Sequence, residues 1–197
     1  MSTNLLRAGP LLVIISSCSA TAPIASAPDT SASVETIAPD PGPPEPVGLA
    51  TLEIADAPSA TPDCASSTSP GADIDAARLY SDPTLTDVSA GLEACTLVGT
   101  PTCTGAKNGD PSAAEGASDS SGFDGFVSLN GRSLVCKWSQ GERLVLGRVV
   151  EVLEVGADTA PEPFRVRACA DEARESCGPF KDVGKLGQTL PAGQLLF

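Results

Sequence analysis

Six cysteines between residues 64 and 177 constrain the fold of this chain more than any other feature of its sequence. An even number of widely spaced cysteines is typical of a domain that is exported to an oxidising compartment and held together by disulfides. The alternative is a metal site, but no CxxC spacing occurs. We therefore expect all six to form disulfides: Cys64, Cys95, Cys103, Cys136, Cys169 and Cys177.

The sequence does not determine how these cysteines pair, because six thiols can combine in many ways. Short separations along the chain favour two local bridges and leave a third, long-range one. The expected pairs are Cys95–Cys103, Cys169–Cys177 and Cys64–Cys136.

A seventh cysteine, Cys18, follows a segment with the composition of an export signal. Arg7 is the only charged residue before Asp29, an apolar run covers 11–15, and two serines precede Cys18. The run is far too short to span a bilayer, which takes roughly 20 residues. We expect export, either by a lipoprotein signal or by an ordinary secretory signal in which Cys18 is incidental. A third alternative is an N-terminus that is not a signal.

The four residues Ile15-Ser16-Ser17-Cys18 resemble the lipobox of bacterial lipoproteins. That resemblance implies cleavage before Cys18 and acylation of its thiol. It also implies an extracytoplasmic protein that a lipid anchors to the bacterial envelope, at the outer membrane or the cell surface.

The chain divides into three segments on this interpretation: a signal peptide at 1–17, a tether at 18–47 and a folded domain at 48–197. The tether consists mainly of Ala, Pro, Ser and Thr with scattered acids. Such a composition cannot bury enough apolar surface to offset the entropy of ordering, so we expect the tether to be disordered.

The charge and the missing histidine exclude several classes of function. The net charge of −13 disfavours nucleic acid as a partner, because an acidic surface repels phosphate backbones. The chain has no His, which excludes Ser-His-Asp and Cys-His catalysis and any His-ligated zinc site. No nucleophile motif is present either, so we expect a protein that is not an enzyme.

Short apolar runs alternate with turn-rich stretches from residue 48 onward, which predicts an all-β sandwich or barrel. Asn130-Gly131 lies between two such runs and predicts a β-hairpin with a type I′ turn. Residues 99–125 predict a long loop. The expected strands lie near 49–54, 74–82 (where a helix is the alternative), 126–129, 133–138, 143–147, 148–156 and 163–170.

The segments GFVSLNGRSLVCKW, RVVEVLEVG and APEPFRVRACADEARESCGPFKDVGKLG resemble bacterial cell-surface domains of the galactose-binding-like, discoidin-like kind. The resemblance covers about residues 70–187. It implies a jelly-roll β-sandwich, here stapled by disulfides. It also implies sugar or surface binding through the loops at one end, and a structural calcium ion.

Five aspartates are the candidate calcium ligands, because calcium is held by carboxylate and carbonyl oxygens. Asp73 and Asp75 form a DxD, whereas Asp110, Asp119 and Asp124 lie in the Gly-rich segment before the predicted hairpin. The alternative is that these acids are solvated groups of an acidic surface. No other cofactor is expected.

Trp138 and Tyr80 are the candidate aromatic platform for a sugar, although Trp138 beside Cys136 also suits the core. Arg165 and Arg167 alternate with apolar residues and should point outward. They could meet the carboxylates of an acidic polysaccharide, or pair with Glu151 or Glu154 on a neighbouring strand.

Taken together, these features favour a non-catalytic binding or adhesion module at the cell envelope, with polysaccharide as one candidate partner. The alternative is an envelope structural or assembly protein that contacts another protein and no sugar.

Overall fold

A computed structural model describes residues 48–58, 64–65, 69–118, 125–155, 162–183 and 188–195. These residues all lie within one unit, Pro43–Phe197. The expected signal peptide and tether lie outside the described residues. Within the described part the strands are β1 (Thr51–Asp56), β2 (Asp73–Tyr80), β3 (Val88–Val98), β4 (Val127–Ser128), β5 (Ser133–Trp138), β6 (Val149–Glu154), β7 (Phe164–Cys169), β8 (Lys181–Val183) and β9 (Gln188–Pro191).

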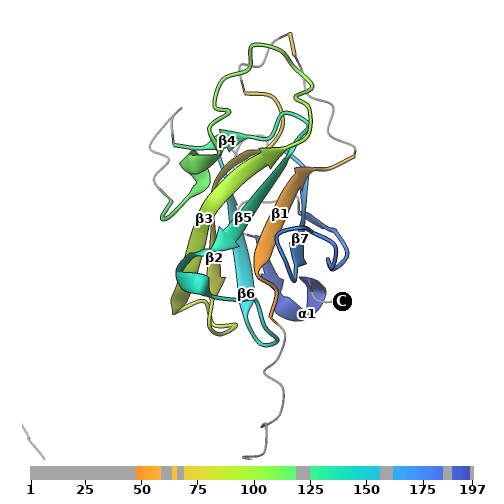
Figure 1. Ribbon diagram of the computed structural model, residues 1–197. Helices are drawn as coiled ribbons and strands as arrows, with labels where there is room; N and C mark the ends of the chain where they lie inside the picture. The colour runs from red at the N-terminus through yellow and green to blue at the C-terminus, as the bar shows by residue number, and fades with distance from the viewer. Residues whose placement is uncertain are drawn as a thin grey trace, which may run out of the picture. The chain divides into compact units, whose positions relative to one another are not determined.

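The strands form one curled antiparallel sheet in the order β8-β7-β1-β5-β3-β2-β6-β9, and β4 pairs with β2 (Figure 1). The long strand β3 belongs to both halves of the sheet. Its first residues pair with β2, and from Leu92 onward it pairs with β5. The all-β prediction is therefore confirmed, as is a strand rather than a helix near 74–82. Helical structure in the described part is limited to short turns: η1 (Pro111–Ala114), η2 (Ser139–Gly141) and α1 (Ala192–Leu195).

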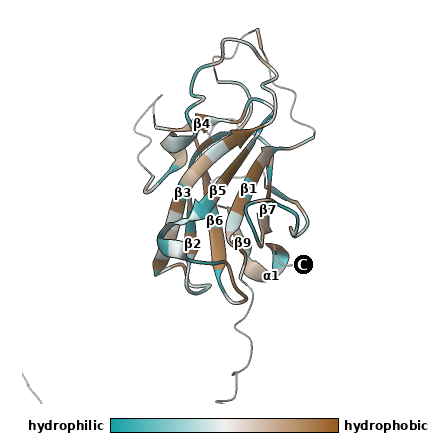
Figure 2. Cartoon of the chain, viewed as in Figure 1, coloured by the Kyte–Doolittle hydropathy of each residue, from teal (hydrophilic) through white to brown (hydrophobic). Residues whose placement is uncertain are grey.

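The core between the two halves of the sheet is built mainly from aliphatic side chains, with Trp138 and Phe164 as its largest fully buried members. The hydrophobic colouring in Figure 2 accordingly follows the strands, whereas the connecting loops are largely hydrophilic. Strand β7 shows the predicted period of two, because Phe164, Val166 and Ala168 are buried while the arginines between them face outward.

The turn at Asn130-Gly131 is confirmed, but the hairpin predicted around it is wrong. Both residues have positive φ, 50° and 77°, and the N–H of Arg132 donates to the carbonyl of Leu129 at 2.9 Å. The strands on either side do not pair with each other. Strand β4 pairs with β2, whereas β5 pairs with β1 and β3, so the turn carries the chain from one half of the sheet to the other.

The segment 143–147 also differs from its predicted strand. Only Leu144 takes part in an isolated bridge, with Leu49, and Leu146 is 77% exposed at the tip of a turn. Its apolar residues do not alternate between two faces as those of a half-buried strand do.

The structure confirms three disulfides and corrects two of the expected pairs. Cys169–Cys177 is confirmed, but the other two bridges are Cys64–Cys103 and Cys95–Cys136. The expected Cys95–Cys103 pair is wrong because Cys95 lies within β3, whereas Cys103 lies in the loop after this strand and is bonded to Cys64. The partner strand β5 instead places Cys136 beside Cys95, with a Cα–Cα distance of 4.1 Å.

Replacement of Gly131 tests whether this turn is as tight as the structure indicates. A Cβ atom at Gly131 would lie 2.0 Å from Oγ1 of Thr102, whose N–H is held by the carbonyl of Asn130. We expect Gly131→Ala to lower the free energy of unfolding by about 2–4 kcal/mol, measured by denaturant unfolding.

Gly105→Ala is the matched control, because Gly105 has a similar φ of 76° and nothing within 4 Å of its would-be Cβ. Gly105→Ala should lower the free energy of unfolding by only about 1 kcal/mol, the strain of an alanine with positive φ. Equal losses in the two variants would show that Thr102 does not crowd the turn.

Candidate functional site

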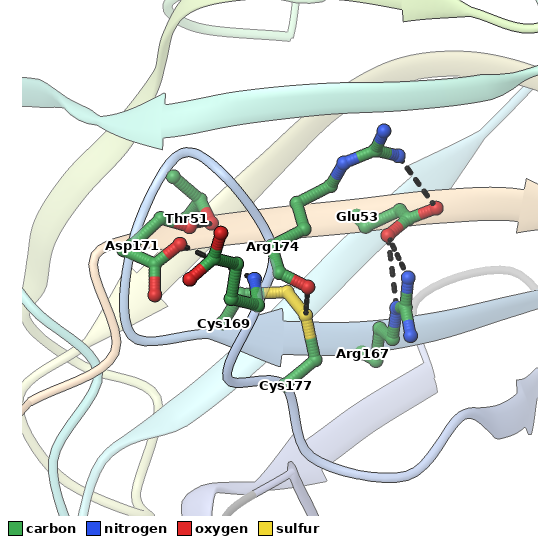
Figure 3. A network of polar contacts seen from close by, with 8 residues as sticks. Thr51, Glu53, Arg167, Cys169, Asp171, Arg174 and Cys177 are labelled. Carbon is green, nitrogen blue, oxygen red and sulfur yellow. Dashed lines mark hydrogen bonds and ion pairs between the residues drawn. A yellow bond between two sulfur atoms is a disulfide. The ribbon is translucent and has the colours of Figure 1, made fainter.

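Glu53 is the centre of a polar network on the outer face of β1, β5 and β7. Its side chain is only 5% exposed, because it lies between Arg167 of β7 and Val135 of β5 in the sheet register. Nε and Nη2 of Arg167 donate to Oε2 of Glu53 at 2.8 and 2.7 Å. Nη1 of Arg174 lies 3.4 Å from Oε1 (Figure 3). Two guanidinium groups therefore compensate this buried carboxylate.

A short loop stapled by Cys169–Cys177 brings Arg174 over this face of the sheet (Figure 3). The N–H of Ala170 donates to the carbonyl of Ser176, and Oγ1 of Thr51 donates to the carbonyl of Asp171 at 3.2 Å. The disulfide and these hydrogen bonds fix the loop on β1.

Arg165 and Arg167 flank the ring of Phe180, with their guanidinium carbons 4.3 and 4.4 Å from its centroid. The expected pairing of these arginines with Glu151 or Glu154 is wrong. Strand β7 neighbours β1 and β8, whereas β6 carries both glutamates in the other half of the sheet.

A small groove of about 130 Å³ lies beside the stapled loop. Lys137 and Glu172 at this groove form an ion pair at 2.6 Å. The volume is well below the roughly 300 Å³ at which ligand pockets begin, so the groove suits a single sugar unit or one side chain. Its polar and apolar lining comes from Thr51, Ala94, Thr96, Val135, Cys136, Lys137 and Glu172.

The groove offers hydrogen-bonding groups of several kinds. The hydroxyls of Thr51 and Thr96 donate to the carbonyls of Asp171 and Val135, so toward a ligand they can accept. The Lys137 ammonium donates and the Glu172 carboxylate accepts. Ala94 lines it with a positive φ of 48°, at the irregularity where β3 shifts its register against β5. This arrangement can bind a polar group. It can bind a carboxylate in particular if that carboxylate replaces Glu172 as the ion-pair partner of Lys137.

A second polar cluster, of four carboxyl groups, lies where β1 and β6 end and where β2 begins. Asp56 accepts hydrogen bonds from the N–H groups of Ala72 and Gly131, at 2.9 and 2.6 Å. Oδ1 of Asp73 accepts from Oγ of Ser69 at 2.5 Å. The other two members of this carboxyl cluster are Glu154 and Glu162.

Burial is the main cause of a raised pKa at each member of the carboxyl cluster. It raises the pKa of Glu154 to about 8, with the charges of Glu162 and Asp73 adding to the shift. The pKa of Glu162 rises to about 7, and that of Asp73 to about 6, where hydrogen bonds from Ser69 and Ser128 oppose the rise. Burial also raises the pKa of Asp56. Burial therefore favours the protonated form of every member of the cluster.

The structure separates the predicted calcium ligands that it describes. Asp73 belongs to the carboxyl cluster, Asp75 accepts from the Ser118 hydroxyl, and the exposed Asp110 caps η1. Asp119 and Asp124 lie outside the described residues. Among the described residues no three acidic or cysteine side chains are arranged to hold a metal ion. A structural calcium ion stays a prediction.

The two aromatic residues predicted as a sugar platform are both buried. Trp138 is 1% exposed and belongs to the core, which favours the core interpretation of this residue. Tyr80 is 6% exposed, and its hydroxyl donates to Oε2 of Glu151 at 2.7 Å. Neither ring presents a face to solvent.

Sequence reasoning identified Arg167 on this surface but missed Glu53, Lys137 and the groove. The sequence gives no signal for a buried Glu53, because a glutamate between Leu52 and Ile54 fits the alternation of a half-buried strand, in which the polar face is exposed. No local spacing connects the members of the carboxyl cluster, which come from four separate segments.

Comparisons with protein-family models, with curated proteins and with solved structures each find no match. Among the described residues, no helix has the length and apolar character needed to cross a membrane.

Replacement of Glu53 tests the ion-pair network. Glu53→Gln leaves Arg167 and Arg174 without their carboxylate, and both are less than one-third exposed. Because the arginines keep some solvent, we expect a loss of about 1–3 kcal/mol in the free energy of unfolding, less than for a fully buried pair.

Glu172→Gln is the matched control, since Glu172 forms a surface ion pair and is 69% exposed. Glu172→Gln should lower the free energy of unfolding by less than about 0.5 kcal/mol. If both variants unfold at the same denaturant concentration, the network around Glu53 does not stabilise the sheet.

Proposed function

We propose that this chain is an exported, lipid-anchored, non-catalytic binding module of the bacterial cell envelope, with a jelly-roll-like sandwich as its folded domain. The observation that carries the proposal is the use of the cysteines. All six from Cys64 to Cys177 form disulfides, and Cys18 alone stands outside them. Such a set suits an oxidising compartment outside the cytoplasm, and it leaves Cys18 free for a lipid.

The groove beside the stapled loop supports a binding role and gives it a place. It is held on strands and on a disulfide-closed loop, so it is preorganised. The Glu172 carboxylate in the groove forms an ion pair with Lys137, and the buried Glu53 forms ion pairs with two arginines. Carboxylates that are paired in this way do not suit acid–base catalysis. The net charge of −13 repels polyanions in general, but this face of the sheet carries the cations of Lys137, Arg165, Arg167 and Arg174. We propose an acidic polysaccharide as the ligand, with one sugar carboxylate bound at Lys137.

Replacement of Cys18 tests the anchor. Cys18→Ser removes the thiol that would carry the lipid, so the protein should move from the membrane fraction to the soluble extracytoplasmic fraction. Ser19→Ala, one residue away, should leave the distribution unchanged. Retention of Cys18→Ser on the membrane would contradict lipid anchoring.

Binding to a defined polysaccharide tests the groove. We expect the protein to bind soluble polygalacturonate and to bind dextran, which lacks carboxylates, far more weakly. Lys137→Ala should reduce polygalacturonate affinity about tenfold, the loss of one charged hydrogen bond, as measured by calorimetry.

Lys107→Ala removes the same charge from an exposed loop and is the matched control. Equal losses for the two lysines would mean that net charge, not the groove, determines binding. Absence of polysaccharide binding, with a single envelope protein recovered by cross-linking, would favour the structural or assembly role instead.

A further inference from the structure

The dipeptide Asn-Gly occurs twice in this chain, at Asn108-Gly109 and at Asn130-Gly131. Asparagine before glycine is especially prone to lose its side-chain amide, because glycine has no side chain to hinder attack by its own backbone nitrogen. Both asparagines have a positive φ, 56° and 50°. The two sites therefore share a sequence and the sign of φ, and they differ in what surrounds them.

The site at Asn130 is tightly held. Asn130 is 2% exposed, its Oδ1 accepts the N–H of Cys103 at 2.8 Å, and its Nδ2 donates to the carbonyl of Cys103 at 2.9 Å. The N–H of Gly131, whose nitrogen would have to attack, donates to Oδ2 of Asp56 at 2.6 Å. Reaction at this site would therefore require an opening that breaks all three hydrogen bonds.

The site at Asn108 is open. It lies in the loop that leads from β3 to η1 and that extends beyond the upper end of the strands in Figure 1. Asn108 is half-buried and Gly109 is exposed. The carbonyl of Asn108 accepts the N–H of Ser128 at 2.7 Å, but among the residues that the structure describes its side chain and the N–H of Gly109 make no hydrogen bond. Small motions of the loop can therefore bring the two reacting groups together.

The guanidinium group of Arg132 lies close to the reacting peptide. Its Nη2 is 3.6 Å from the position that a Cβ atom of Gly109 would take. Hydrogen bonds to the carbonyls of Leu129 and Ser128 hold the group there. A nearby cation stabilises the negative charge that develops when a backbone nitrogen loses its proton and attacks a carbonyl carbon. Arg132 is thus placed to promote reaction at Asn108.

We propose that Asn108 is a site of spontaneous deamidation promoted by Arg132, whereas the fold protects Asn130. The nitrogen of Gly109 attacks Cγ of Asn108, and a new N–C bond forms as the bond from Cγ to the side-chain nitrogen breaks. The proton of the Gly109 N–H passes through water to the leaving nitrogen, which departs as ammonia. Water then opens the succinimide ring at either carbonyl and gives aspartate or isoaspartate at position 108. The reaction needs water alone and does not depend on the proposed binding function.

Both products change the loop after β3. Each replaces a neutral amide by a carboxylate close to Arg132. Isoaspartate also leads the main chain through the former side chain and lengthens it by a methylene group, which displaces the carbonyl that accepts the N–H of Ser128. The loop should then lose this bond to β4, while the Cys64–Cys103 disulfide keeps it attached to the domain.

Peptide mapping by mass spectrometry of the purified full chain, aged for days in mildly alkaline buffer, tests the proposal. Conversion at Asn108 should be at least about tenfold faster than at Asn130, where three hydrogen bonds must break first. In the matched control, the reduced and denatured chain, the two sites should convert at similar rates. Equal rates in the folded protein, faster conversion at Asn130, or conversion of Asn108 only after denaturation would each overturn the proposal.

Variants at Arg132 test its role separately. Arg132→Gln should slow conversion at Asn108 severalfold in the folded protein, and Arg132→Lys, which keeps the charge, should restore most of the rate. Neither variant should alter the rate at Asn108 in the denatured chain. Arg143→Gln removes an exposed arginine from the opposite end of the sheet and should leave the rate unchanged. Equal rates in Arg132→Gln and the unsubstituted protein would show that Arg132 does not promote the reaction.

Discussion

The change of partner along β3, fixed by the Cys95–Cys136 disulfide, is the constraint on which the rest of the fold depends. β3 begins in one half of the sheet and ends in the other, and its register shifts between Glu93 and Thr96. Ala94 takes a positive φ at this irregularity, and the carboxylate of Glu115 accepts the N–H of Cys95 at 2.8 Å. A bridge that closes a loop of this length stabilises a domain by about 4 kcal/mol on the chain-entropy model. The disulfide thus fixes the curl of the sheet and, on the outer surface, one wall of the groove.

The two polar clusters show two ways of accommodating buried acids. On the outer face, Glu53 is compensated by two guanidinium groups and remains a fixed part of the sheet. At the loop end, no arginine or lysine of the described residues forms an ion pair with the carboxyl cluster, and burial raises the pKa of each of its members. The first arrangement supports a rigid binding surface.

Much of the sheet was predictable, because its strands carry local patterns. β7 alternates apolar and basic residues, β6 is rich in valine, and the turn at Asn130-Gly131 requires two positive φ values. β3 was missed because its sequence, VSAGLEACTLV, contains a glycine and loses its alternation at the irregularity. The error in the partner of Cys95 follows from that gap, because Cys95 lies on β3. The error in the partners of Arg167 has another cause: no local pattern indicates that β7 lies between β1 and β8. No local sequence pattern indicates the carboxyl cluster, because its members come from four separate segments.

Peptide mapping of the unreduced protein by mass spectrometry is the most direct test of this account. The account predicts a peptide that links Cys95 to Cys136, together with Cys64–Cys103 and Cys169–Cys177, and no free thiol among these six. A Cys95–Cys103 bridge, or free thiols at Cys95 and Cys136 in the folded protein, would contradict it. Either result would remove the constraint on β3, and free thiols would also contradict the proposed export to an oxidising compartment.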